Sequence, residues 1–570
     1  MKKSILLITS FLSICSLASC NKSNEPAPDA DTIVIADPLD LGEGFNEEYY
    51  PKKEDNKVPS IIRGSSTKMK IDIALDYDGT EEGWQALANE YMRLCGNAVT
   101  VNLVTGLDTA SYTDRLRNEE NNPSTDWDIV QGNLLNSVDG HCLNLADVIR
   151  SSKNPYAGNK AWVDVVEESA YVTDVTGSSD ATYLLNTESL STAWFINSKS
   201  AAEANITDTT PETWDDLIAM LDKYQAAGYK YPFGISLSSD SITASQFYWL
   251  LRIYGDYYFR QEYTYTSKTF DPLTETDSKF VYDKFATNQE SYASFSFSYS
   301  RGLCIMLDAS SPYYCGPQSN IYKDFIYQLS RLAKYIRPSA YNQSFNDVRT
   351  SFMAQKDGGG KEAPQIMLDY TGSGLAFLNA EALKNNIDFF DYPTIESDYV
   401  AKGTLTRDVG GNGGYLALFN YAKKKQQDLN KDFLKFVLSP YGQTIYYKAL
   451  RENGRSPKGL TTVKNNLVII PEAWKDFFQT DKVSFTGLAD SNSMLNIGVI
   501  GLQNLDKVTE KTVTLWQSIL RTENQKSVEE FTEDWHYCLH SNWPKVATLH
   551  SWKEDAWYQS NFADPEYIQA

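Results

Sequence analysis

The 570-residue sequence is poor in positive charge, in histidine and in clustered cysteine. It has 52 Lys and Arg against 74 Asp and Glu, a formal net charge of −22, which argues against a protein that neutralises nucleic-acid phosphates with a basic face. Only four histidines occur and no CxxC pair is present, so the sequence supports neither a zinc ribbon nor a thioredoxin-type site. We therefore expect no nucleic-acid partner, no metal and no cofactor.

The sequence also lacks the arrangements that are typical of catalytic sites. His536 and His540 lie on one predicted helix face with Glu533, but their order is not HExxH. The GGGK run at 358–361 does not have the spacing of a phosphate-binding loop, and no GxSxG follows a strand. No local motif selects a carboxylate pair for glycoside hydrolysis. We expect no catalytic residues and no enzyme.

The first 20 residues are typical of an export signal, because two lysines precede an apolar stretch and small residues lead up to a cysteine. Leu17-Ala18-Ser19-Cys20 resembles the bacterial lipobox, which implies that residues 1–19 are removed and that Cys20 is lipidated. No later stretch is apolar over the ~18 residues of a membrane span, so the acylated Cys20 would be the only link to a lipid bilayer. The residue that follows is Asn21, and the absence of an aspartate there favours the outer membrane of the cell envelope, facing the periplasm or the cell surface.

Residues 20–67 are rich in Pro, Asp, Glu, Asn and Ser and have no sustained periodicity, which predicts a flexible tether. From Lys68 onwards short apolar strands alternate with amphipathic helices, as in KMKIDIALDY, EEGWQALANEYMRLC and NAVTVNLV. This alternation predicts an α/β fold with a parallel sheet covered on both sides. Further along, TPETWDDLIAMLDKYQAAGY predicts a helix with Thr210 as its N-cap and Gly228 beyond its end. The Tyr-, Phe- and Ser-rich stretch 256–313 is interpreted as an insertion.

Four collinear groups of segments resemble the family 1 extracellular solute-binding proteins, the maltose-binding-like receptors of sugar ABC importers. The first is EEGWQALANEYMR with NAVTVNLV and DWDIVQGN, and the second is TAWFINSKSAAEANITDTTPETWDDLIAMLDKYQAAGYKYPFGISL. The third is APQIMLDYTGSG with IDFFDYPTI, and the fourth is GGNGGYLALFN with DFLKFVLSPYGQTIYYK and NGRSPKG. Together they cover about residues 68–465.

The resemblance implies a type II periplasmic-binding-protein-like fold, with two α/β lobes around a ligand cleft and helical C-terminal additions. Lobe 1 would combine residues 68–192 and 396–462, and lobe 2 would combine 195–392 and 463–570. The chain would cross between the lobes at TAWFIN, at FFDYPTI and near SPKG. The insertion and the helical tail make this chain larger than typical members of the family.

Sugar sites combine aromatic rings, which cover the C–H faces of the sugar, with polar groups for its hydroxyls, and the sequence has 37 Tyr and 12 Trp. In α/β sheets ligands bind beyond the carboxyl ends of the strands. The candidate ligand-binding residues chosen on these grounds and by position in the family pattern are Asp76, Tyr77, Gln131, Asn133, Trp194, Tyr248, Trp249, Asp369, Tyr370, Gly411 and Asn412.

These observations predict a lipid-anchored extracellular protein that captures a carbohydrate, preferably an oligosaccharide, for uptake through a membrane transporter permease. The alternative is a surface glycan-binding lipoprotein that partners an outer-membrane SusC-like transporter. SusD-like proteins share the size, lipobox, tether and aromatic richness. They are built mostly from helical repeats, so the strand and helix alternation counts against that fold, although not against that role.

Overall fold

The computed structural model describes most of the chain between Glu25 and Leu549. The described residues are 25–76, 79–107, 128–131, 142–167, 170–173, 182–237, 246–270, 306–311, 314–384, 386–404, 406, 411–412, 414–420, 423–457, 459–472, 474–475 and 508–549. The predicted signal sequence and Cys20 lie outside these ranges.

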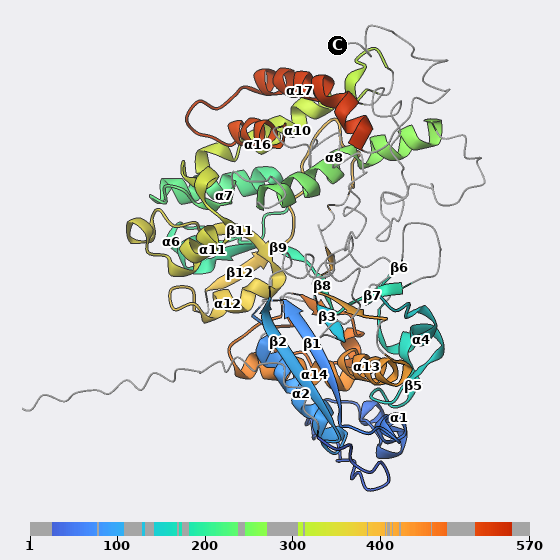
Figure 1. The fold of residues 1–570 in the computed structure, drawn as a ribbon. Coiled ribbons are helices and arrows are strands. Elements are labelled where there is room, and N and C mark those ends of the chain that lie inside the picture. The colour runs from blue at the N-terminus through green and yellow to red at the C-terminus, as the bar shows by residue number, and fades with distance from the viewer. Residues whose placement is uncertain are drawn as a thin grey trace, which may run out of the picture.

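The first lobe is built on a six-stranded sheet in the order β2-β1-β3-β14-β7-β6 (Figure 1). Its strands are β1 (Met69–Asp76), β2 (Val99–Leu107), β3 (Ile129–Gln131), β6 (Tyr171–Thr173), β7 (Thr182–Asn186) and β14 (Tyr415–Leu418). Alternation along β1 buries Ile71 and Ile73 completely, and helix α2 (Glu81–Leu94) buries Trp84 and Tyr91 in the same core. Further helices of this lobe are α1 (Val58–Ile62), α4 (Ala146–Ser151), α5 (Trp162–Val165), α13 (Lys424–Val437) and α14 (Pro440–Glu452).

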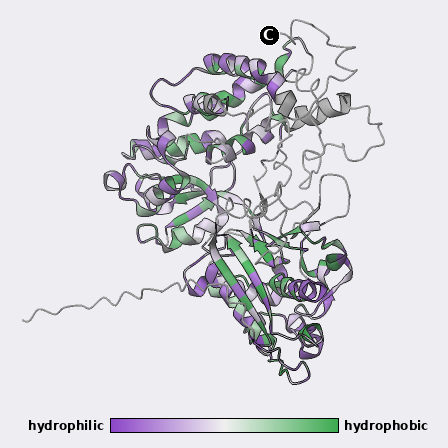
Figure 2. Cartoon of the chain, viewed as in Figure 1, coloured by the Kyte–Doolittle hydropathy of each residue, from purple (hydrophilic) through white to green (hydrophobic). Residues whose placement is uncertain are grey.

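The second lobe has a four-stranded sheet in the order β10-β11-β9-β12. Its strands are β9 (Thr192–Asn197), β10 (Phe233–Gly234), β11 (Ile366–Tyr370) and β12 (Ile387–Phe390). The helices that belong to it are α6 (Ser198–Glu203), α7 (Trp214–Ala226), α8 (Gln246–Phe270), α10 (Asn320–Ser330), α11 (Phe345–Ala354) and α12 (Gly374–Asn379). Figure 2 shows hydrophobic residues along the strands of both lobes and hydrophilic residues on the outer helices.

Strand pairing is mixed, which corrects the expectation of a parallel sheet. β1 is parallel to β2 and β3, and β10 is parallel to β11. β14 is antiparallel to β3 and β7, and β9 is antiparallel to β11 and β12. β9 and β14 are the antiparallel strands that come first after the chain passes from one lobe to the other. They therefore enter their sheets from the end opposite to the one used by strands that are connected through helices.

A small three-stranded sheet, β13-β8-β15, lies where the chain passes between the lobes. It consists of β8 (Glu188–Leu190), β13 (Gly411–Asn412) and β15 (Leu460–Thr461), and β8 leads directly from β7 of the first lobe into β9 of the second. Helix α14 holds this hinge sheet at two points. Tyr446 donates to Glu188 Oε1 at 3.0 Å, and Tyr447 accepts from the Thr461 amide at 2.5 Å.

The segment 25–67 differs from the predicted tether, because its described residues pack on the first lobe. Phe45, Val58 and Ile62 are buried in the core of that lobe. The segment is also held by backbone contacts, as Arg93 donates to the Asp37 carbonyl at 2.6 Å and Leu39 N donates to the Tyr441 hydroxyl at 2.6 Å. It covers the end of the first lobe that lies farthest from the second lobe (Figure 1).

The C-terminal residues divide between the lobes differently from the prediction. Trp474, which the prediction assigns to lobe 2, is buried in the first core. Helices α16 (Val508–Ser518) and α17 (Val528–Leu549) then enlarge the second core, where Trp516 packs against Trp535 at 5.7 Å between ring centroids. The other predicted lobe boundaries stay predictions. Part of the predicted insertion, 256–270, is a continuation of α8, while residues 271–305 lie outside the described ranges.

Among the described residues, no helix combines the length and the hydrophobicity of a membrane span.

Candidate functional site

The strand ends of both lobes meet at the hinge sheet. Along the continuous run from β8 to β9, Leu190 pairs with Gly411, and Thr192 pairs with Tyr370 at the end of β11. The Thr371 amide also donates to the Ser191 carbonyl at 2.9 Å. Tyr370 of the second lobe is therefore adjacent to the hinge sheet, because its partner Thr192 is only two residues from Leu190, which pairs with β13.

Three partly exposed rings gather beside this point, and we call Trp249, Phe345 and Tyr370 the aromatic cluster. The centroids of Trp249 and Tyr370 are 4.6 Å apart, those of Trp249 and Phe345 5.5 Å, and those of Phe345 and Tyr370 6.3 Å. Each ring is only partly covered, in contrast to the fully buried aromatics of the core. Rings that remain partly exposed in such a group offer apolar faces to a ligand.

Local hydrogen bonds fix the first turns of α8 and α11, the helices that carry two of these rings. Gln246, the first residue of α8, accepts from the Ser236 amide at 2.8 Å and donates to the Leu368 carbonyl at 2.7 Å, which fixes the start of α8 against β11. Ser344 and Asp347 form a capping box at the start of α11, and these hydrogen bonds lower the pKa of Asp347. The cap places Phe345 in the first turn of α11.

A buried ion pair lies next to the rings. Both Asp369 carboxylate oxygens accept from Arg349, Oδ2 from Nε at 2.8 Å and Oδ1 from Nη2 at 2.7 Å. Asp369 is fully buried, and Oδ1 also accepts from the Tyr370 amide at 2.6 Å and from Ser373 Oγ at 3.1 Å. Burial raises the pKa of Asp369, and the Arg349 charge opposes that shift. Burial raises the pKa of the Tyr370 hydroxyl to about 12.

Of the predicted second-lobe residues, the structure brings Tyr248, Trp249, Asp369 and Tyr370 together. Tyr248 is partly buried and lies beneath the Arg252 guanidinium, at 5.3 Å from its ring centroid. Asp369 has no exposed surface, so its role differs from the direct ligand contact that the sequence predicts. Its carboxylate orients Arg349 instead.

Trp194 does not belong to the site, which corrects the prediction of a hinge ring that faces the ligand. Its side chain is 0 % exposed and stacks between Phe233, at 5.3 Å, and Phe390, at 5.8 Å. All six residues of β9 are buried, because this strand is covered on both faces and paired on both edges. The indole therefore has no surface to offer.

The described candidates of the first lobe lie at strand ends or in the hinge sheet, and the others lie outside the described residues. Asp76 ends β1, and Gln131 ends β3 with its side chain nearly buried beside Gly414. Gly411 and Asn412 form β13 of the hinge sheet. Tyr77 and Asn133 lie outside the described ranges.

The sequence analysis missed Phe345 and Arg349. They are four residues apart on α11, and the Arg349 guanidinium carbon lies 4.1 Å from the Phe345 ring centroid. The spacing in FNDVRTSF is a signal for this contact, because residues i and i+4 share a helix face. The link from Arg349 to Asp369 joins different elements and has no sequence signal.

Within the described part of the chain, no group of three or more His, Cys, Asp and Glu side chains is arranged to hold a metal ion. His536 and His540 lie on α17 with ring centroids 6.2 Å apart. Burial, and then the neighbouring His540, lower the pKa of His536.

Two α/β lobes joined by a multi-strand hinge define the class of the solute-binding folds. The sequence matches the bacterial extracellular solute-binding protein family over residues 77–444, and the chain belongs to this family. It is therefore an extracellular solute-binding protein and not an enzyme.

The following three solved structures have the same fold. A protein studied for xylan utilization by the thermophilic bacterium Caldanaerobius polysaccharolyticus has a TM-score of 0.51 at 13 % identity, over 82 % of this chain and 99 % of the other. A chitin oligosaccharide binding protein has 0.50 at 14 %, over 82 % and 99 %. The bacterial solute receptor AcbH, described as exclusive for β-D-galactopyranose, has 0.50 at 12 %, over 84 % and 100 %. No curated protein sequence matches this chain.

Proposed function

We propose that the protein binds a carbohydrate, preferably an oligosaccharide, at the aromatic cluster beside the hinge and passes it to an ABC-type importer. The single observation that carries this proposal is the group of partly exposed rings Trp249, Phe345 and Tyr370, within 6.3 Å of one another at the hinge edge of the second lobe. The chitin oligosaccharide binding protein and AcbH share the fold, which supports a sugar as the ligand.

The chemistry of the cluster suits a sugar. A pyranose ring has an apolar C–H face, which gains free energy when it covers an aromatic ring, and hydroxyls that need hydrogen-bond partners. A polar group flanks the rings, since Arg349 lies over Phe345, and the Gly411–Asn412 strand pairs with β8 in the adjacent hinge sheet. A ligand that contacts both lobes would favour their closed arrangement by its greater affinity for that state.

We further propose that the mature protein is anchored by a lipidated Cys20, as the lipobox resemblance implies. The described chain begins five residues later, at Glu25, whose carbonyl accepts from Lys68 N at 3.0 Å. The anchor would therefore hold the first lobe near the bilayer. The partner would be a membrane transporter that receives the sugar.

Thermal unfolding of the mature chain against galactose, maltose, cellobiose and chitobiose tests the sugar assignment. A ligand that binds only the folded state adds about 2.7 kcal/mol at 100 times its Kd, so binding raises the unfolding temperature. We expect Trp249→Ala to weaken binding about 30-fold, equivalent to about 2 kcal/mol for a central aromatic contact.

Tyr537→Ala is the matched control, because Tyr537 is a 74 % exposed aromatic on α17, outside the cluster. This variant should bind like the wild type. If none of the four sugars binds while a peptide panel does, the carbohydrate assignment is wrong. If Trp249→Ala and Tyr537→Ala lost sugar affinity equally, the sugar would not bind at the aromatic cluster.

A further inference from the structure

The Arg349 guanidinium is fixed in place but only partly used. Its Nε and Nη2 donate to Asp369, and Nη2 also donates to Ser373 Oγ at 3.1 Å. Its flat face lies over the Phe345 ring at 4.1 Å. Among the described residues, Nη1 has no partner, and the side chain is 24 % exposed. One edge of the guanidinium therefore presents two N–H donors beside the aromatic cluster.

The charge of this donor is already balanced. Asp369 is 0 % exposed, and its two oxygens face four donors: Arg349 Nε, Arg349 Nη2, the Tyr370 amide and Ser373 Oγ. An ionised carboxylate accepts hydrogen bonds and donates none, so this donor set matches the charged form of Asp369. The pair is neutral as a unit, although the N–H bonds of Nη1 remain strongly polarised.

From this geometry we infer that Arg349 donates to an uncharged hydroxyl of the bound sugar, with Asp369 as its positioning residue, so that the site selects neutral saccharides over uronic acids. The inference rests on the proposed sugar-binding function and extends it to the ligand's charge. Asp369 occupies the Nε–Nη2 edge of the guanidinium, and Nη2 also donates to Ser373 Oγ, so neither of its two-pronged edges is fully free for a ligand carboxylate. Its negative charge also weakens the attraction of the guanidinium for a second carboxylate at Nη1.

Arg252 is a second cation among the described residues of α8, and it stacks on Tyr248. It is four residues from the buried Asp256 on the same helix. Should Arg252 dominate the local charge, the site would prefer uronates, and the experiment below separates the two cases.

The test compares each panel sugar that binds with its C6-carboxylate form, such as galacturonate for galactose, by isothermal titration. The wild type should bind the neutral form at least 10-fold more tightly. Asp369→Asn removes the balancing charge with little change in shape, so the preference should shift at least 10-fold towards the uronate. Loss of packing alone would weaken both forms equally and leave their ratio unchanged.

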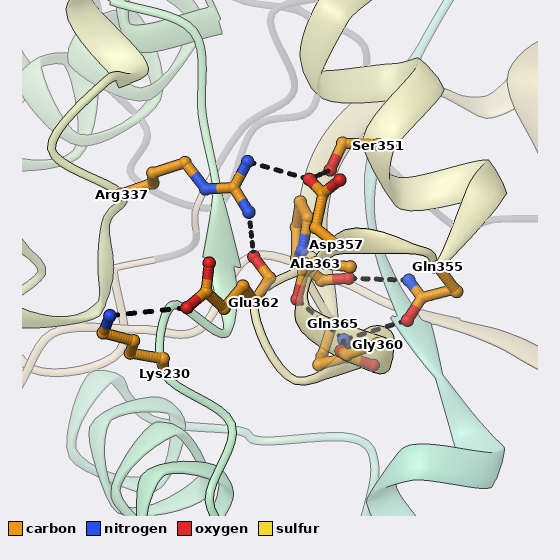
Figure 3. A network of polar contacts seen from close by, with 10 residues as sticks. Lys230, Arg337, Ser351, Gln355, Asp357, Gly360, Glu362, Ala363 and Gln365 are labelled. Carbon is orange, nitrogen blue, oxygen red and sulfur yellow. Dashed lines mark hydrogen bonds and ion pairs between the residues drawn. The ribbon is translucent and has the colours of Figure 1, made fainter.

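Asp357→Asn is the matched control. Asp357 also pairs with an arginine, since Arg337 Nη1 lies at 2.8 Å, and it accepts from Ser351 Oγ at 2.6 Å in a polar network that contains none of the clustered rings (Figure 3). Its substitution should leave the ratio unchanged. A circular dichroism spectrum identifies any variant that has not folded.

Arg349→Lys provides a second test that keeps the charge but loses the fixed fork of donors. We expect it to weaken the neutral sugar about 10-fold. The inference is overturned if the wild type prefers the uronate, if folded Asp369→Asn keeps the wild-type ratio, or if Arg349→Lys binds like the wild type. If no saccharide of either charge binds the wild type, it is the proposed function itself that fails.

Discussion

Trp194→Ala should destabilise the second lobe strongly without changing the ligand site directly. The indole is 0 % exposed and stacks on Phe233 and Phe390, with angles of 29° and 12° between ring planes. An aromatic side chain that buries about 200 Å² contributes roughly 5 kcal/mol at 25 cal/mol per Å². Measured substitutions of core Trp or Phe by Ala cost about 3–5 kcal/mol. We therefore expect a loss of about 4 kcal/mol in the free energy of unfolding.

Urea unfolding followed by far-ultraviolet circular dichroism measures this loss as a lower midpoint, and Trp194→Phe should lose clearly less because it keeps a stacked ring. Below the transition, folded Trp194→Ala should bind sugar within about threefold of the wild type, a change of under 1 kcal/mol. A variant with the wild-type midpoint and no sugar binding would refute the reasoning. That result would mean that the Trp194 ring contacts the ligand.

Two further predictions concern other regions. Because the pKa of His536 is lowered in the folded protein, the unfolded chain binds more protons below about pH 6.5, so stability should fall as the pH drops through this range. The unfolding temperature should therefore decline less between pH 7.5 and 5.5 in His536→Gln than in the wild type, and identical declines would contradict the shift. Phe45→Ala should cost about 3 kcal/mol by urea unfolding, whereas Val34→Ala, at an 80 % exposed position, should cost almost nothing. If neither substitution changed the free energy of unfolding, segment 25–67 would not be packed on the first lobe.

The sequence predicted the α/β fold well, because helix and strand periodicities are local. Helix α7 illustrates the limit of that locality. The predicted N-cap was Thr210, whereas the helix begins after Thr213, whose side chain and that of Asp216 form a reciprocal capping box. Gly228 follows the helix with a φ of +88°, as a glycine beyond a helix end commonly does. The first residue of a helix thus depends on which of several nearby side chains forms the capping hydrogen bonds.

The tether prediction failed for a related reason. Composition alone indicated a flexible segment, since Pro, Asp and Asn are frequent there. A few well-spaced apolar residues, Phe45, Val58 and Ile62, are nevertheless enough to dock it on a large existing core. Such docking depends on a surface formed by distant residues, which composition does not reveal.

The site was predicted in part. The aromatic cluster contains two of the candidate residues, Trp249 and Tyr370. Trp194 is buried instead, as the continuous apolar run in TAWFIN indicates for a strand covered on both faces. Arg349 and Asp369 are 20 residues apart and meet only through the packing of α11 against β11. The contact between Arg349 and Asp369 could therefore be found only in the three-dimensional structure.

The central claim is that a sugar binds at the hinge edge of the second lobe. Hydrogen-exchange mass spectrometry, with and without the tightest-binding saccharide of the panel, tests it most directly. The account predicts slower exchange in residues 246–252, 345–350, 369–374 and 411–416, which carry the aromatic cluster, Arg349 and the hinge strand. Protection confined to other parts of the chain, such as α10 or α17, would contradict the account.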